Sequence, residues 1–348
     1  MRSGQNVSDA VTPTLSRIYL TFSAPARANY YGDKALAGLR ASGEVAVNPL
    51  DRALDTRELI EASRGCAIIV ADRETAGTAE LFRNSPSLVA FVRCAVDIRN
   101  VDVAAASENG VIVTRAGPGF VVSVAEWAIG VMIDLSRRIS DAVGAYRVGT
   151  VLAPTMGREL QRATLGVIGY GSIGRYLCDL ALGFGMRVVV TDPAATVTDP
   201  RIRQASLAEV LDESDFLVCL APANPQTENL MNASTFAQMK PGAYFINASR
   251  AELVDDAALK RALDVGHLAG CALDVGRAPD QKPTLELASH PKVVATPHIG
   301  GLTLQAVEYQ AQETVEQVAA ILHGRVPEGA VNAEKAARLA SLAKSRQP

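Results

Sequence analysis

A glycine-rich turn between an apolar strand and a helix constrains the fold of this chain more than any other feature. Residues 164–168 (TLGVI) are typical of a short buried strand, and residues 169–174 (GYGSIG) follow them directly. Apolar residues then recur at helical spacing at Ile173, Leu177, Leu180 and Phe184. A strand that passes through such a turn into a helix opens a βαβ unit, so the segment predicts a parallel sheet covered by helices.

The spacing of the glycines indicates what the turn binds. Gly169 permits a tight turn, Gly171 lets the backbone approach a pyrophosphate, and Gly174 lets the helix pack closely on the strand. The amides of Ser172 and Ile173 open the helix, where unpaired N–H groups and the positive end of the helix dipole attract an anion. We therefore expect the turn to bind the pyrophosphate of a dinucleotide.

An acidic residue after the next strand favours one dinucleotide over the other. Asp192 ends residues 187–192 (RVVVTD), about 20 residues beyond the turn, where a carboxylate accepts from the ribose 2′-hydroxyl and repels a 2′-phosphate. The sequence thus predicts NAD rather than NADP. The alternative is an ordinary glycine-rich turn with an acid nearby.

A separate series of strands and helices precedes this unit. Apolar runs at residues 17–22, 45–47, 66–70 and 88–92 predict strands, and residues 33–41 and 56–62 predict helices. Their alternation predicts a small doubly wound domain without a dinucleotide fingerprint. At 348 residues, the chain is long enough for two such domains.

The remaining segments suggest how the two domains are connected. Residues 123–142 predict a long helix, opened by Ser123 and Glu126 as a capping box. A second βα series runs from 165 to about 297, and a last helix over 304–322 would return the chain to the first domain. Residues 335–348 read as a solvated tail.

Composition excludes several classes of protein. The net charge of −3 comes from interspersed signs, which argues against nucleic acid, and no apolar run is long enough to span a membrane. The polar first residues lack the apolar core of a signal peptide, so we expect a cytoplasmic protein. The five cysteines lie mostly in apolar stretches and read as buried residues rather than as disulfides or metal ligands.

Four further segments resemble one enzyme family: residues 222–230 (PANPQTENL), 245–255 (FINASRAELVD), 272–275 (ALDV) and 296–301 (TPHIGG). Together with the glycine turn they resemble the D-isomer-specific 2-hydroxyacid dehydrogenases, which include phosphoglycerate, glyoxylate/hydroxypyruvate and formate dehydrogenases. The resemblance implies an α/β protein with two doubly wound parallel-sheet domains. A flavodoxin-like substrate domain would comprise residues 1–118 and 302–348, and an inserted Rossmann NAD-binding domain residues 119–301. It also implies hinges near Gly119 and Gly301, and a homodimer formed largely through the cofactor domains.

The resemblance implies an NAD-dependent oxidoreductase that transfers a hydride between nicotinamide and C2 of a D-2-hydroxy acid or 2-oxo acid. Such chemistry needs an acid/base for the hydroxyl proton and a cation for the substrate oxygens. His298 matches the family's acid/base, and Arg250 matches the arginine that holds the substrate carboxylate and polarises its carbonyl. Asp274 matches the residue that receives the nicotinamide carboxamide; its alternative role is that of a strand-end acid capping a loop.

Other site residues follow from the same resemblance. The implied cofactor contacts beyond the glycine turn and Asp192 are Pro222, Thr227, Ala248, Ser249, Arg250, Asp274, His298 and Gly300. The implied substrate contacts are Ala95, Val96, Arg73 and Arg250. No metal is expected.

The chain departs from the family at the residue that should support the histidine. The family has a Glu-Pro pair after the Leu-Asp-Val segment, and its glutamate hydrogen-bonds the catalytic histidine. Here Pro279 stands at that position, followed by Asp280. Asp280 could replace the glutamate, another carboxylate could do so, or His298 could work unassisted with an altered pH profile. We favour Asp280 as a third catalytic residue.

A second departure lies in the substrate domain. The family's glycine-rich turn, whose backbone amides hold the substrate carboxylate, is replaced by residues 95–99 (AVDIR). The amides of Ala95 and Val96 survive this change, but Asp97 and Arg99 replace a glycine and an acid, which predicts an unusual substrate. Arg73 could read a second acidic group, or it could be a solvated loop residue.

Two other functions stay open. One is an NAD(H)-sensing protein that resembles the family's transcriptional corepressors and turns over little substrate, although retention of Arg250 and His298 argues against it. The other is a dehydrogenase that oxidises formate or phosphite, since such relatives share the same arginine and histidine.

Overall fold

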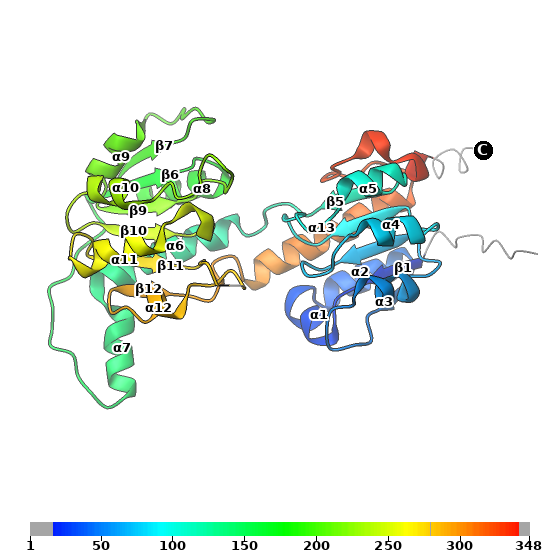
Figure 1. The fold of residues 1–348 in the computed structure, drawn as a ribbon, viewed down its shortest axis with the longest axis horizontal. Helices are drawn as coiled ribbons and strands as arrows, with labels where there is room; N and C mark the ends of the chain where they lie inside the picture. The colour runs from blue at the N-terminus through cyan, green and yellow to red at the C-terminus, as the bar shows by residue number, and fades with distance from the viewer. Residues whose placement is uncertain (1–16, 279, 341–348) are drawn as a thin grey trace, which may run out of the picture. The chain divides into compact units, whose positions relative to one another are not determined.

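A computed structural model describes residues 17–278 and 280–340, which form two compact units. One unit contains residues up to Gly119 and from Leu304 onward, and the other contains Phe120–Thr303. Each unit is a parallel sheet with helices on both faces (Figure 1). The predicted α/β class with two doubly wound parallel sheets is confirmed. The N-terminal leader and the end of the tail lie outside the described residues.

The sheet of the first unit has five parallel strands in the flavodoxin-like order β2-β1-β3-β4-β5. The strands are β1 (Arg17–Leu20), β2 (Glu44–Val47), β3 (Ile68–Ala71), β4 (Ala90–Arg93) and β5 (Ile112–Arg115). The helices that follow strands in this unit are α1 (Ala24–Tyr30), α2 (Asp33–Ser42), α3 (Thr56–Ala62), α4 (Ala79–Asn84) and α5 (Val103–Glu108). Because side chains alternate along a strand, Ile18 and Leu20 join the core on one face and Tyr19 joins the core on the other.

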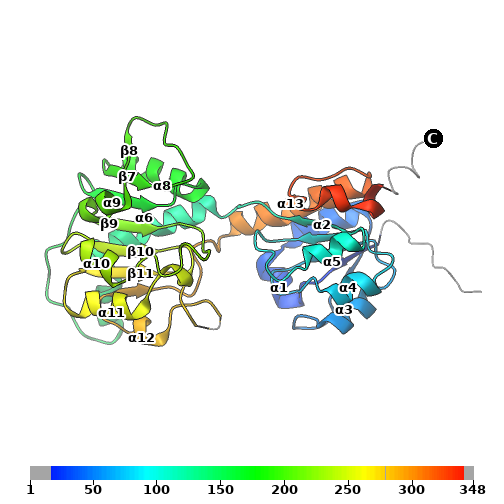
Figure 2. The same ribbon diagram turned by 45° about the horizontal axis from the view of Figure 1, so that its top comes forward.

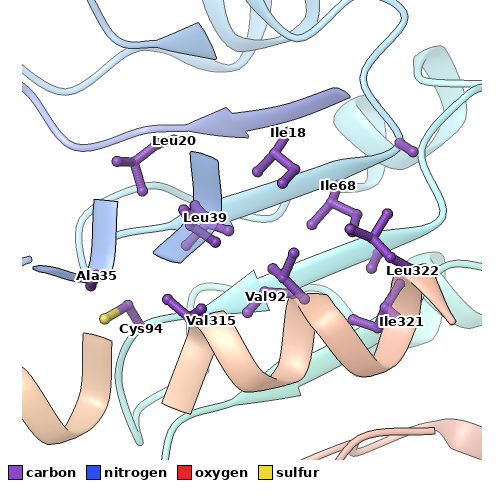
Figure 3. Packing of buried hydrophobic residues seen from close by; sticks show 14 of the residues in the cluster. Ile18, Leu20, Ala35, Leu39, Ile68, Val92, Cys94, Val315, Ile321 and Leu322 are labelled. Atoms are coloured by element: carbon purple, nitrogen blue, oxygen red, sulfur yellow. The ribbon is translucent and has the colours of Figure 1, made fainter. Parts of the chain in front are cut away.

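The C-terminal part of the chain completes this unit. Helix α13 (Leu304–Leu322) lies beside α2 (Figure 2), and Val315 and Ile321 pack into the core shown in Figure 3. A short 3-10 helix, η2 (Ala333–Lys335), follows. The prediction of a solvated tail from residue 335 is wrong as far as residue 340, because Ala336 and Leu339 are buried in the same core.

The sheet of the second unit has seven parallel strands in the order β12-β11-β10-β9-β6-β7-β8. The strands are β6 (Thr164–Ile168), β7 (Arg187–Thr191), β8 (Ile202–Gln204), β9 (Phe216–Cys219), β10 (Tyr244–Asn247), β11 (Gly270–Leu273) and β12 (Val293–Ala295). Its helices between strands are α8 (Ser172–Gly183), α9 (Leu207–Glu213), α10 (Ala233–Gln238), η1 (Ala251–Leu253), α11 (Asp256–Asp264) and α12 (Leu285–Ala288). The strand order reverses between β6 and β9, which is where a doubly wound sheet binds a dinucleotide.

The helical segment that opens this unit differs from its prediction. Helix α6 (Val121–Arg137) begins before Ser123, which is a buried residue inside the helix, and its hydroxyl lies 2.7 Å from that of Thr303. The capping box was therefore wrong, because the chain was already helical at the predicted cap. Arg138 then takes a left-handed φ of 54° and separates α6 from α7 (Ile139–Arg147).

Two expectations from composition can be compared with the structure. All five cysteines are buried, as predicted. In the part of the chain that is described, no helix combines the length and apolar character needed to cross a bilayer.

Candidate active site

The glycine turn lies at the carboxyl end of β6, next to β9. A Cβ on Gly169 would come within 2.8 Å of Ala221 N, and its φ of 102° is one that other residues rarely adopt. A Cβ on Gly174 would lie 2.3 Å from Gly169 O, whereas one on Gly171 would meet nothing within 4 Å. Packing therefore requires the first and third glycines, and the second presents open backbone to a ligand.

The turn delivers an uncapped helix end. Helix α8 begins at Ser172, and no side chain caps its first turn. Ser172 is exposed and Ile173 is half-buried, so these first-turn residues are reached from solvent. Open N–H groups at the positive end of a helix dipole suit a pyrophosphate.

Asp192 is held against this turn. Its Oδ2 accepts from Tyr170 N at 2.7 Å, and its Oδ1 accepts from Ala194 N at 2.8 Å and Ala195 N at 3.1 Å. Burial works to raise the pKa of Asp192, but these three hydrogen bonds outweigh it and lower the pKa below the usual aspartate value. Since a carboxylate offers roughly four acceptor positions, one is left for a ribose hydroxyl.

Hydroxyl groups order the loops that follow β9 and β10. The Thr227 hydroxyl donates to Pro222 O at 2.7 Å, which closes the loop after β9 on itself. The Ser249 hydroxyl donates to Ala221 O at 2.6 Å and joins that loop to the one after β10, where Ala248 is half-buried. These predicted cofactor residues therefore lie at neighbouring strand ends.

The position of Arg250 is fixed by hydrogen bonds within its own loop. Its carbonyl accepts from the Asn247 side chain at 2.9 Å, and its Nη1 donates to Ser249 O at 2.8 Å. Arg250 also lines a cavity of about 250 Å³, formed by residues 250–252 and 275–278 together with Gln281. A guanidinium beside a cavity of this size can hold a small anion.

Asp274 organises the loop that carries His298. Its carboxylate, in a residue only 4% exposed, accepts from the Thr296 hydroxyl at 2.6 Å, Ile299 N at 2.8 Å and Gly300 N at 2.7 Å. His298 has a left-handed φ of 61°, a conformation that costs an ordinary residue about 1–2 kcal/mol. The Asp274 hydrogen bonds lie on both sides of His298 and hold that conformation in place.

Strand register brings these three residues to one edge of the sheet. Asn247 pairs with Leu273, and Leu273 pairs with Ala295. Arg250, Asp274 and His298 follow the three strands within a few residues of these partners. The structure thus places the predicted anion holder after β10 and the predicted acid/base after β12, on either side of β11 and on the same edge as the glycine turn.

The segment predicted to supply the third catalytic residue forms a tight loop. Gly276 N donates to Gln281 O at 3.0 Å, and a Cβ on Gly276 would lie 2.3 Å from Pro283 Cα. The exposed Asp280 carboxylate pairs with Lys282 at 2.8 Å, and this hydrogen bond lowers its pKa. Pro279 lies outside the described residues.

Arg277, which sequence reasoning did not single out, fastens this loop to the rest of the unit. Its guanidinium donates to Val254 O at 3.0 Å, Asn229 Oδ1 at 2.8 Å and Glu228 Oε1 at 3.1 Å. Its position in the departing segment was the signal that could have identified it.

The predicted substrate residues of the first unit lie on loops after β3 and β4. Arg73 is exposed, Ala95 is buried and Val96 is half-buried. Asp97 and Arg99, which replace the family's glycine and acid, form an ion pair with each other at 2.7 Å. Their opposite charges therefore offset one another beside Ala95 and Val96.

A fully buried arginine was missed at the start of this loop. Arg93 is the last residue of β4 and is 0% exposed. A charge at the end of the apolar run 88–92 was a sequence signal for it.

Trp127, in the second unit, was also missed: its indole N–H is buried, and within the described residues it has no acceptor. No sequence signal marked Trp127, because it occupies an apolar position within a predicted helix.

Comparison with known proteins agrees with this geometry. The sequence model of the NAD-binding domain of D-isomer-specific 2-hydroxyacid dehydrogenases matches residues 129–300. Hydroxypyruvate reductase of Thermotoga maritima is 32% identical over 268 residues, which are 76% of this chain and 88% of that protein. The TT0316 protein of Thermus thermophilus is 32% identical, with a TM-score of 0.80 over 90% of this chain and 99% of that structure.

The chain belongs to the D-isomer-specific 2-hydroxyacid dehydrogenase family. D-3-phosphoglycerate dehydrogenase of Rattus norvegicus is 33% identical over 81% of this chain, which spans only 53% of that longer relative. The chain thus spans about half the length of the phosphoglycerate dehydrogenases that it matches. Its membership in the family supports NAD as the cofactor.

The residues of this dehydrogenase family member fit NAD. Gly171 leaves open backbone, the uncapped start of α8 can hold a pyrophosphate, and Asp192 retains an acceptor for a ribose hydroxyl. The loop after β9, ordered by Thr227, then lies between that turn and the loop after β10, which carries Ser249 and Arg250.

Proposed function

We propose that the protein is an NAD-dependent oxidoreductase that interconverts a D-2-hydroxy acid and its 2-oxo acid. The observation that carries this proposal is the placement of Arg250, Asp274 and His298 at the carboxyl ends of β10, β11 and β12, on the edge that also bears the glycine turn. We assign cofactor binding to the second unit and substrate binding to loops of the first.

The chain's own residues would handle charge and protons. In the reductive direction bound NADH supplies the hydride for C2 of the oxo acid. Arg250 binds the substrate carboxylate and draws electron density toward the carbonyl oxygen, which makes C2 more electrophilic. The protonated imidazole of His298 donates a proton to that oxygen, and in the oxidative direction the neutral imidazole removes it. Asp274 holds the His298 loop and is also proposed to receive the nicotinamide carboxamide.

We retain Asp280 as the proposed partner of His298. For this role its carboxylate must exchange Lys282 for the imidazole, and its exposure on a small loop allows that exchange. An adjacent carboxylate raises the pKa of a histidine, so Asp280 would keep His298 protonated to higher pH.

A substrate panel tests the proposed activity. Purified protein is mixed with NADH and glyoxylate, hydroxypyruvate, pyruvate, phenylpyruvate or 2-oxoglutarate, and NADH absorbance is followed; formate and phosphite are tested with NAD. We expect consumption of NADH with at least one oxo acid and its loss in Arg250→Gln and His298→Asn. Tight NADH binding with no turnover of any compound would instead favour the sensing protein.

We also propose that the protein is a homodimer formed through the second unit. Helix α7 has no buried residue, and its apolar side chains Ile139, Val143 and Tyr146 recur at helical spacing with exposures of 47%, 42% and 67%. Figure 1 shows this helix projecting from the body of its own unit. Sedimentation velocity should give a dimer for the wild type and a monomer for Val143→Asp. Val265→Asp, at an exposed residue beyond α11, is the control that should stay dimeric.

A further inference from the structure

Arg93 is a buried cation that donates its hydrogen bonds to uncharged acceptors. Its Nη1 donates to Asp72 O, and its Nη2 donates to Thr75 O at 2.8 Å and to Asn100 Oδ1 at 2.6 Å. Burial lowers the pKa of this arginine to about 10, which leaves it charged at neutral pH. Keeping a guanidinium away from water is unfavourable unless its donors are used. Both Nη atoms of Arg93 are used, whereas its buried Nε has no acceptor among the described residues, so the Nη contacts are what hold the side chain in place.

The acceptors belong to two loops that the proposed substrate site uses. Asp72 and Thr75 lie after β3 on either side of Arg73, and Asn100 ends the loop that begins at Ala95 after β4. Asn100 strengthens the connection, since its Nδ2 donates to the carbonyl oxygens of Arg73 and Glu74 at 3.3 Å each. Arg93 and Asn100 together tie one loop to the other.

The first of these loops is also rigid in itself. The Asp72 carboxylate accepts from Glu74 N at 3.0 Å and Thr75 N at 2.8 Å, and the Thr75 hydroxyl donates to that of Thr21 at 2.9 Å, just beyond β1. A stiff loop gives Arg93 a fixed support. Across the described residues, the main-chain amides of Ala95 and Val96 have no acceptor, so they are free to receive an anion.

We propose that Arg93 is a positioning residue for the substrate carboxylate. By joining the 72–75 and 95–100 loops, it holds the amides of Ala95 and Val96 in place. The proposal rests on the proposed function, because it takes these amides as the carboxylate site. The ion pair between Asp97 and Arg99 adds no net charge beside Ala95 and Val96. Of the buried cations, Arg93 is the one nearest to Ala95 along the chain.

Three variants and one matched control test the proposal. Asn100→Ala removes an exposed side chain, so it should fold and release only the connection between the loops. Arg93→Lys keeps the charge but not the fork of donors, and Arg93→Met removes both. The control is Arg338→Met: Arg338 Nη1 donates to Ser85 O at 2.8 Å and Leu88 O at 2.6 Å, which are carbonyls before the amino end of the same strand, β4.

Each protein is measured for Tm, for KM and kcat with the best oxo acid of the panel, for the Kd of NADH, and for hydrogen exchange of amides 94–99. Asn100→Ala removes all three hydrogen bonds of this side chain. We expect it to raise KM about tenfold, the effect of weakening one hydrogen bond between the loop amides and a charged carboxylate. The kcat and the Kd of NADH should change little, and exchange at 94–99 should accelerate. Arg93→Met should raise KM further, and Arg93→Lys should restore part of the loss. Arg338→Met should lower Tm without raising KM.

Two results would overturn the proposal. The first is that Asn100→Ala and Arg93→Lys both fold and both keep the wild-type KM and the wild-type hydrogen exchange at amides 94–99. The second is an Arg338→Met protein whose KM rises as much as that of Arg93→Met, since general destabilisation would then explain both. If the wild type reduces no oxo acid, the proposed function fails and hydrogen exchange alone decides whether Arg93 orders the loop.

Discussion

Replacing Asp274 with asparagine tests whether this carboxylate holds the His298 loop. The carboxylate accepts three hydrogen bonds, from the Thr296 hydroxyl, Ile299 N and Gly300 N. An asparagine that keeps its oxygen toward Thr296 and Ile299 turns its NH2 group toward the buried Gly300 N–H. One charge-assisted bond is lost and one buried donor is left unsatisfied, which together cost about 2–4 kcal/mol. For a unit of this size the Tm should fall by roughly 5–15 °C.

Catalysis should suffer more than folding. His298 would no longer be held at its left-handed φ of 61°, and misplacing a reacting group by about 1 Å can cost roughly a hundredfold in rate. We expect Asp274→Asn to lower kcat by one to two orders of magnitude in single-turnover measurements at a temperature where the protein is folded. A rise in the Kd for NADH would add support for the nicotinamide contact.

The matched control is Asp264→Asn in the same unit. Asp264 is an exposed acid that pairs with Lys260 at 2.8 Å and His290 at 3.2 Å, and exposed pairs contribute little to stability. Its Tm and kcat should stay near those of the wild type. If Asp274→Asn also has the Tm and the kcat of the wild type, the argument that Asp274 holds His298 is refuted.

Three further predictions concern the cofactor site and the acid/base. Gly171→Ala should keep the wild-type Tm but weaken NADH binding, because its Cβ enters open space above the turn. Gly169→Ala should lower Tm, because its Cβ would contact backbone atoms at 2.8 Å. Calorimetry measures the effect on stability, and NADH fluorescence measures binding. Asp192→Asn should narrow the preference for NADH over NADPH. Because the pKa of Asp192 is lowered, its carboxylate stays charged and the wild-type preference should persist as pH falls to 5. A preference lost at pH 5 would contradict this. Asp280→Asn should move the His298 limb of the pH–rate profile to lower pH, since a neighbouring carboxylate raises an imidazole pKa; an unchanged profile removes Asp280 from the mechanism.

The sequence predicted the elements whose signals are local. The strand, turn and helix around residues 164–183 were readable because apolar periodicity and glycine spacing act over neighbouring residues. Helix α13 was predicted with its observed bounds for the same reason. Short helices such as α4 and α5, each six residues long, gave too little periodicity to be recognised.

Predictions failed where a distant contact determined the local structure. Ser123 has the identity of a cap residue, but the helix had already begun and its hydroxyl meets Thr303, which is 180 residues away in the chain. Ala336 and Leu339 look like part of a polar tail, yet they fill the core of the first unit. Neither partner is visible in the sequence around these residues.

For this protein the sequence alone determined the dinucleotide turn and the preference for NAD, because these depend on residue identity at short spacing. It gave Arg250 and His298 as candidates only through the resemblance of their motifs to those of the family. Tertiary structure decided that Asp274 orders the histidine loop and that Arg93 joins the loops after β3 and β4. Those roles depend on hydrogen bonds between strand ends that only the parallel sheet brings together.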